Sequence, residues 1–138
     1  MNPVVGALSA VWLGMVLAIS FLEAPVKFRA PGVTLPIGLA IGRRVFAALN
    51  RIEVALAAAI VLAAGFGARS SGMIVAGIGA IVVLAIQLVA VRPVLARRSD
   101  RVLAGETDGP RSRAHLVYVG LELLKVAALI AAVVTASP

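Results

Sequence analysis

Four long apolar runs are the feature that most limits what this chain can fold into. They cover approximately residues 4–22, 45–66, 73–91 and 114–134. A helix needs about 20 apolar residues to cross roughly 30 Å of hydrocarbon. Of the 138 residues, 62% are hydrophobic and only 14% are charged, which is too little polar surface to cover a water-soluble globule. The sequence therefore predicts an all-α integral membrane four-helix bundle, with residues 1–138 as a single transmembrane domain.

Basic residues gather in two of the three connections between these runs. Ten of the 13 Lys and Arg lie within residues 23–44 or 92–113, whereas the remaining connection contains only Arg69 and the termini contain none. By the positive-inside rule, both basic connections are expected to be cytoplasmic loops, with the N- and C-termini outside. We therefore expect a multi-pass protein of the cell membrane, specifically the bacterial inner membrane. The net charge of +7 then reflects topology and contact with the lipid bilayer, and nucleic acid is not expected as a partner.

Proline and capping residues indicate where the connections contain helices. No proline lies inside the runs, and five are expected in connections, where a missing amide donor costs little: Pro25, Pro31, Pro36, Pro93 and Pro110. Thr34 followed by Pro36 is typical of a helix start, so residues 35–44 are predicted to lead into the second span. Pro93 indicates the start of a further helix at the membrane surface.

Ionisable and polar residues within the spans share helical faces. The fourth run contains four such residues at spacings of 3, 4 and 3: His115, Tyr118, Glu122 and Lys125. The second repeats this spacing with Arg43, Phe46, Asn50 and Glu53. Such spacing places each set on one side of its helix. An ionised side chain facing lipid costs at least about 2.5 to 3.5 kcal/mol, so both faces are expected to turn into the bundle.

These faces predict a buried charged site that opens to the cytoplasm. Its members are expected to be Asn50, Glu53, Gln87, Glu122 and Lys125, with three further residues at its mouth, Glu23, His115 and Tyr118. Lys125 should pair with Glu53, with Glu122, or with both. Three carboxylates against one lysine leave an excess of negative charge, which a proton, a cation or a basic ligand must neutralise.

Two interpretations of this cluster remain open. It is either a static ion-pair network that fixes helix register or a site for a proton, an ion or a small solute. Replacing Glu122 and Lys125 together by Gln and Met should distinguish them, because the static network predicts preserved activity. In an enzymatic alternative, Arg43, Arg44 and Arg51 would bind an anionic headgroup or cosubstrate.

Several other chemistries are not expected. The chain has no cysteine, and His115 is its only histidine, so one chain cannot ligate haem through two histidines and no metal site is predicted. The indole N–H of Trp12 is expected to point into the bundle. Small residues at helical spacing predict close helix packing or a homo-oligomer interface: Gly6, Ala10, Gly14 and Ala18; Ala55, Ala59 and Ala63; and Gly72, Ala76 and Ala80.

Two short segments carry a resemblance to a known group of membrane domains. A Pro-x-x-Phe element ends the first helix at Pro25 to Phe28, and a Gly-Arg-x-x-Phe-like segment, Gly42 to Phe46, leads into the second. In this the chain resembles poorly characterised bacterial four-helix membrane domains related to copper-resistance-D-like proteins. The resemblance implies the same topology along the chain. It does not imply copper or haem, because the relatives with those roles use intramembrane histidines that are missing here.

The second span also resembles that of the MAPEG class of glutathione-using membrane enzymes. The Arg-rich, Asn-x-x-Glu pattern of that helix is matched by Arg43, Arg44, Asn50 and Glu53. The tyrosines of that class are missing, since Val54 directly follows Glu53. The sequence favours a small, non-enzymatic polytopic protein that handles a proton, cation or small solute at Glu53, Glu122 and Lys125. The alternatives are a MAPEG-like enzyme acting on a lipophilic substrate and an accessory subunit of a membrane complex.

Overall fold

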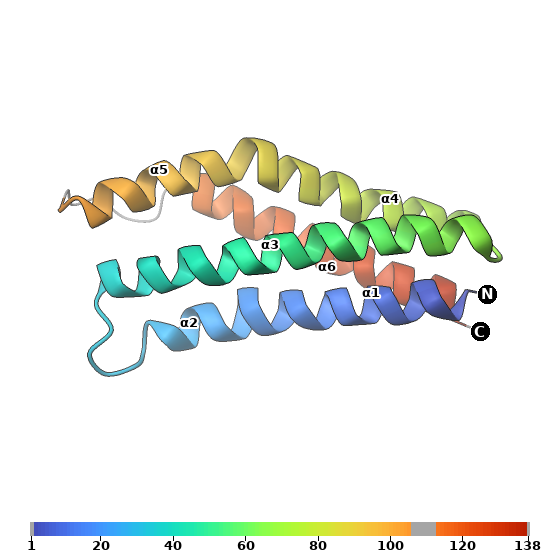
Figure 1. The fold of residues 1–138 in the computed structure, drawn as a ribbon, viewed down its shortest axis with the longest axis horizontal. Coiled ribbons are helices and arrows are strands. Elements are labelled where there is room, and N and C mark those ends of the chain that lie inside the picture. Colours follow the sequence, from blue (N-terminus) through green and yellow to red (C-terminus); the bar gives the residue numbers. More distant parts are fainter. Residues whose placement is uncertain (1, 106–112, 138) are drawn as a thin grey trace.

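The structure is a bundle of long helices, seen in a computed structural model that describes residues 2–105 and 113–137 (Figure 1). Within these residues there is no β-strand, and four helices are long and apolar enough to cross a membrane. The first joins three segments, α1 (Pro3–Val16), the π-helical η1 (Leu17–Glu23) and α2 (Ala24–Lys27), and the second is α3 (Leu35–Phe66). The third joins α4 (Ser71–Ile86), the π-helical η2 (Gln87–Val91) and α5 (Arg92–Leu103), and the fourth is α6 (Arg113–Ala136). The predicted all-α membrane bundle is thus confirmed.

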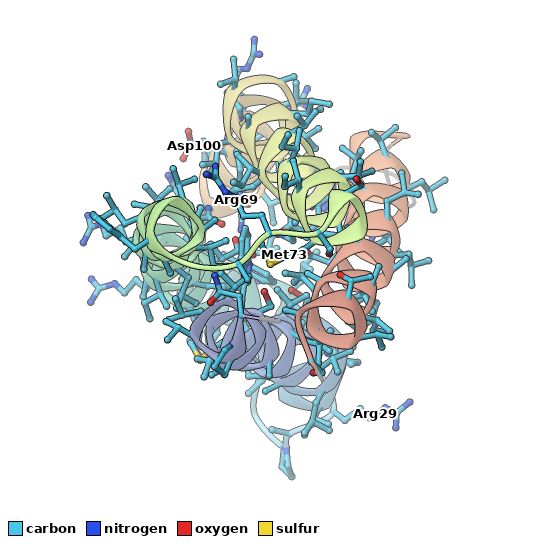
Figure 2. All side chains as sticks on the ribbon, turned by 90° about the vertical axis from the view of Figure 1, so that its right-hand side faces the viewer. Arg29, Arg69, Met73 and Asp100 are labelled. Atoms are coloured by element: carbon cyan, nitrogen blue, oxygen red, sulfur yellow. The ribbon has the colours of Figure 1, made fainter. Side chains whose placement is uncertain are left out.

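The four helices run antiparallel to their chain neighbours, so the two termini lie at the same end (Figure 1). Viewed from that end, they surround a filled centre into which Met73 points, whereas Arg29 extends outward (Figure 2). Helix α6 packs against α1 on one side and α4 on the other. Large apolar side chains such as Leu62, Val75 and Val134 remain more than half exposed on the outside. Such a surface suits lipid better than water.

Polar side chains start three of the helices. The Asn2 side chain accepts a hydrogen bond from the Val5 amide at the start of α1, and Ser70 does the same for α4 through Met73. Thr34 caps α3 through the amide of Ile37, as its sequence position predicts. Residues 35–44 are accordingly the first turns of α3, which at 32 residues exceeds what a bilayer requires.

Pro25 and Pro93 lie inside continuous helices, although both are expected in connections from the sequence. Pro25 is in α2 and Pro93 is in α5, and each follows two residues after a π-helical segment ends. A proline lacks the amide hydrogen and its ring clashes with the carbonyl four residues earlier. Widening the preceding turns relieves that clash without breaking the helix. The basic connections therefore contain much helix, while residues 106–112, including Pro110, lie outside the described residues.

Close packing around Asn2 joins the helices at the end that holds the termini. The Asn2 amide donates to the Ala136 carbonyl at 3.1 Å, and its side-chain amide donates to the Ala63 carbonyl at 3.3 Å. A Cβ at Gly67 would lie 2.5 Å from the Asn2 Nδ2 atom, so any other residue there would displace the Asn2 side chain. One residue thus contacts α3, α6 and the turn that precedes α4.

Small residues mediate some of the helix contacts within the chain. A Cβ at Gly6 would lie 3.6 Å from the Cβ of Ala136, and one at Gly79 would lie 3.8 Å from that of Ala128. The remainder of the first predicted ridge, Ala10, Gly14 and Ala18, is exposed on the outer surface. The packing interpretation therefore applies to part of the small residues, and the homo-oligomer stays a prediction.

Candidate functional site

Lys125 is the centre of a charged cluster buried between all four helices. Its Nζ lies 2.6 Å from Glu53 Oε1, 2.6 Å from Glu122 Oε1 and 2.7 Å from Gln87 Oε1. An ammonium has three hydrogens, so each can be donated to one of these oxygens. Glu53 and Lys125 have no exposed surface and Glu122 is 1% exposed. The predicted pairing of Lys125 therefore occurs with both carboxylates at once.

Glu53 anchors the cluster to the first helix as well. The Trp12 indole donates to Glu53 Oε1 at 3.0 Å, and this is the same oxygen that Lys125 contacts. Glu53 Oε2 is buried without a hydrogen-bond partner among the described residues. Trp12 does point inward as expected, but it contributes a polar contact in addition to core packing.

Glu122 divides its two oxygens between the cluster and the first helix. Oε1 accepts from Lys125 and, at 3.4 Å, from the Gln87 side-chain amide, while Oε2 accepts from the Ser20 hydroxyl at 2.8 Å. Ser20 lies in η1 and Gln87 begins η2, so both π-helical segments present a polar side chain to the same carboxylate. Distorted helical turns of this kind occur frequently at functional sites.

The charge balance of the cluster differs from the predicted one. Glu23 lies outside it and instead forms an ion pair with Lys27, one turn further along, at 3.5 Å. Two carboxylates and one ammonium remain, so the cluster carries one net negative charge when all three groups are ionised. Because the three groups are almost completely buried, that charge favours a counter-charge at close range.

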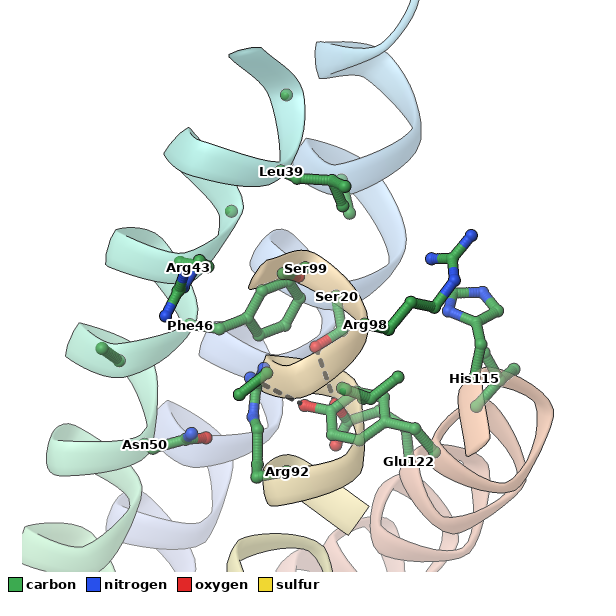
Figure 3. Close-up of a pocket in the computed structure, with 18 of the residues that line it drawn as sticks. Ser20, Leu39, Arg43, Phe46, Asn50, Arg92, Arg98, Ser99, His115 and Glu122 are labelled. Atoms are coloured by element: carbon green, nitrogen blue, oxygen red, sulfur yellow. Dashed lines mark hydrogen bonds between the residues drawn. The ribbon is translucent and has the colours of Figure 1, made fainter. Parts of the chain in front are cut away.

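A cavity of about 450 Å³ lies beside the cluster, with Glu122 in its wall. All four helices line it, and its wall includes Lys27 and Phe28 near the first basic connection and Arg98 and His115 on either side of the second. Arg98 and His115 lie side by side in Figure 3. Glycine allows part of this wall to close. A Cβ at Gly38 would overlap the ring of Phe28, and one at Gly42 would lie 3.1 Å from the Lys27 Nζ atom.

Arg92 is held in the cavity wall by two aromatic rings. Its guanidinium carbon lies 4.6 Å from the ring centre of Phe46 and 5.0 Å from that of Tyr118. The two rings meet edge to face at 6.1 Å. An Nη2–H donates to the Tyr118 hydroxyl at 3.5 Å (Figure 3). These contacts fix the position of the guanidinium but supply no negative charge.

The other predicted residues take several positions. Asn50, His115 and Tyr118 line the cavity, and Tyr118 is buried. Asn50 makes no side-chain hydrogen bond within the described part of the chain, so it belongs to the cavity and not to the hydrogen-bonded cluster. Among the arginines, Arg43 lines the cavity and pairs with Asp100 of α5. Arg44 and Arg51 are exposed on the outer side of α3 and do not line the cavity.

Three contributors to the site were not predicted in these roles. Ser20 and Trp12 bind the carboxylates from the first helix, and Arg92 was counted only as a topology signal. Pro25 and Pro93 are the sequence features that could have indicated the positions of Ser20 and Arg92, because a proline inside a helix indicates altered turns just before it. The two segments that carried the first family resemblance both contribute cavity residues, among them Phe28 and Phe46.

Comparison with protein-family models, with curated proteins and with solved structures found no match to this chain. The class of protein therefore follows from the fold and the site themselves. The chain is a multi-pass helical membrane protein with a buried salt-bridge network next to a cavity.

Proposed function

We propose that this protein binds a small solute in the cavity and a proton in the charged cluster, and that Glu122 connects the two sites. One observation carries the proposal. Glu122 contacts Lys125 at 2.6 Å inside the cluster and also forms part of the cavity wall. A change in its charge would therefore be felt by anything bound in the cavity. The basic connections at the cavity end favour an opening to the cytoplasm of a bacterial inner membrane.

The unbalanced charge supports a proton as the counter-charge. Lys125 Nζ already occupies the centre of the cluster, where it would repel a second cation at short range. A proton binds directly to a carboxylate oxygen and needs no coordination shell. Two titratable groups of α6 interact with Glu122, namely Lys125 and Tyr118. Lys125 also contacts Glu53 on α3, and Tyr118 also interacts with Arg92 on α5. The neutral partners are Ser20 and Gln87.

Infrared spectroscopy of the protein in phosphatidylcholine bilayers tests the proton directly. The carbonyl band of a protonated carboxyl group should appear and disappear as pH is changed, and Glu122→Gln should abolish that band. Glu23→Gln is the matched control, because Glu23 lies outside both the cluster and the cavity wall. The control should retain the band.

Trp12 provides an independent readout in the same samples. It is the only tryptophan of the chain and donates to Glu53, so its emission should report the charge state of the cluster. We expect the emission to titrate with the infrared band. A spectrum without a titrating carboxyl band, or a band that persists in Glu122→Gln, would contradict the proposal. A static ion-pair network would then be the better description.

A further inference from the structure

The Arg92 guanidinium in the cavity wall has no acidic partner among the described residues, and this indicates which kind of solute fits the cavity. Of the other basic residues that line the cavity, Lys27 pairs with Glu23, Arg43 pairs with Asp100, and Arg98 and His115 make interactions of their own. Arg92 contacts two rings and a hydroxyl, and no carboxylate of the described residues lies within ion-pair distance. Its Nε atom is buried without a hydrogen-bond acceptor among those residues. A buried donor without an acceptor is costly, so an acceptor supplied by a ligand is favoured.

The geometry of Arg92 selects the kind of anion. A guanidinium presents parallel N–H groups in a plane, which match the paired oxygens of a carboxylate or a phosphate. Phe46 and Tyr118 flank the guanidinium and so restrict its orientation before any ligand arrives. Preorganisation of this kind lowers the ordering cost of binding.

The rest of the wall selects an apolar body. Phe21, Leu39, Leu88, Leu95 and Val119 contribute hydrocarbon surface to the cavity. Its volume of about 450 Å³ lies within the range of roughly 300 to 1,000 Å³ typical of small-molecule sites. Glu122 disfavours a second negative charge near the cluster. The ligand should therefore carry one anionic group on a compact apolar body.

On the basis of the proposed function, we infer that Arg92 is the anion-binding residue of this cavity and that its ligand is an amphiphile with a single carboxylate or phosphate head. Such chemistry has two sources, a phospholipid of the surrounding bilayer and a soluble amphiphile. The protein would bind the head at Arg92 and the apolar body between the four helices.

Calorimetric titration in phosphatidylcholine nanodiscs tests the inference with decyl phosphate as the probe. Decanol shares the apolar chain and inorganic phosphate shares the anion. We expect saturable binding of decyl phosphate at least tenfold tighter than binding of either. Arg92→Gln should weaken decyl phosphate binding at least tenfold. Arg44→Gln is the matched control, since Arg44 is exposed outside the cavity, and it should leave the affinity unchanged.

The outcomes separate the ligand sources and the two proposals. Competition by phosphatidylglycerol added to the nanodiscs would identify a lipid as the ligand, whereas binding that is insensitive to it would identify a soluble amphiphile. Equal affinity for decanol and decyl phosphate, or unchanged binding in Arg92→Gln, would overturn the inference. In that case a titrating infrared band of Glu122 would still support the proposed function. Absence of that band would contradict the proposed function itself.

Discussion

Lys125 shows how a membrane interior tolerates a charged residue. Its Nζ atom has three oxygens within 2.7 Å, one for each ammonium hydrogen, and two of those oxygens belong to carboxylates. Burying an ion pair brings little net stability, but removing one partner leaves an uncompensated charge in a medium that solvates it poorly. The sign of the remaining charge therefore decides what each substitution does.

Lys125→Met should be strongly destabilising and Glu122→Gln should not. The first leaves two buried carboxylates without a counter-charge and is expected to cost about 3 to 5 kcal/mol. Glu122→Gln leaves one carboxylate and one ammonium, and the oxygen of the new glutamine can still accept from Ser20. We therefore expect the free energy of unfolding to change by no more than about 1 kcal/mol. Unfolding in mixed micelles, followed by circular dichroism, measures both.

The double variant Glu122→Gln with Lys125→Met is the control for charge. It restores one net negative charge, as in the original cluster, and should lie between the two single variants in stability. If Glu122→Gln proved as damaging as Lys125→Met, charge balance would not be the governing factor in this cluster.

Trp12→Phe should cost about 1 to 3 kcal/mol beyond the small loss of ring volume. Phenylalanine cannot donate to Glu53 Oε1, which now accepts from the indole at 3.0 Å. Combining it with Glu53→Gln gives a double-mutant cycle whose coupling energy isolates the contact. Additive single effects would show that the indole contributes only by packing.

At the level of elements, the two π-helical segments decide which side chains reach Glu122. They end two residues before Pro25 and Pro93, and they contain Ser20 and Gln87. Pro93→Ala restores an amide hydrogen and removes the ring clash, so the preceding turns can return to α-helix. That change rotates Gln87 relative to Arg92.

We expect Pro93→Ala to retain its helix content and to bind decyl phosphate several-fold more weakly. Circular dichroism and calorimetry measure the two quantities. Pro31→Ala is the control, because Pro31 lies in the turn between α2 and α3 and outside the cavity wall. Undiminished affinity in Pro93→Ala would show that the wide turns do not shape the cavity.

The same elements show how far the sequence could lead. Helical spacing predicts that Glu53, Glu122 and Lys125 face one another, because α3 and α6 keep a regular 3.6-residue turn where those residues lie. It could not place Ser20 beside Glu122, since a π-helical segment changes the direction of every side chain across it. The position of Arg92 in the cavity wall could not be predicted for a different reason. Its aromatic partners come from α3 and α6, and only tertiary structure brings them together.

For the whole molecule, orientation in the membrane is the next quantity to measure. The chain has no cysteine, so single cysteines can be introduced without removing any. Arg69 lies between α3 and α4 and Ser137 directly follows α6, at the end that holds the termini (Figure 1). Arg29 follows α2 and Arg97 belongs to α5, and both of these helices lie toward the opposite end (Figure 1).

Arg69→Cys and Ser137→Cys should react with a membrane-impermeant maleimide in intact cells. Arg29→Cys and Arg97→Cys should react only after the cells are permeabilised. This pattern follows from the positive-inside rule, given that ten of the 13 basic residues lie in the connections at the second end. The reverse labelling pattern would place the cavity on the outer side.

The hydrogen bonds of Asn2 bear on the path by which a solute could enter and leave the cavity. They fasten α1, α3 and α6 together at the end away from the cavity. If the cavity binds a solute as proposed, we expect that solute to enter and leave at the end opposite Asn2. Transport of such a solute to the other side of the membrane would then require the Asn2 hydrogen bonds to break, whereas binding and release at one side would not.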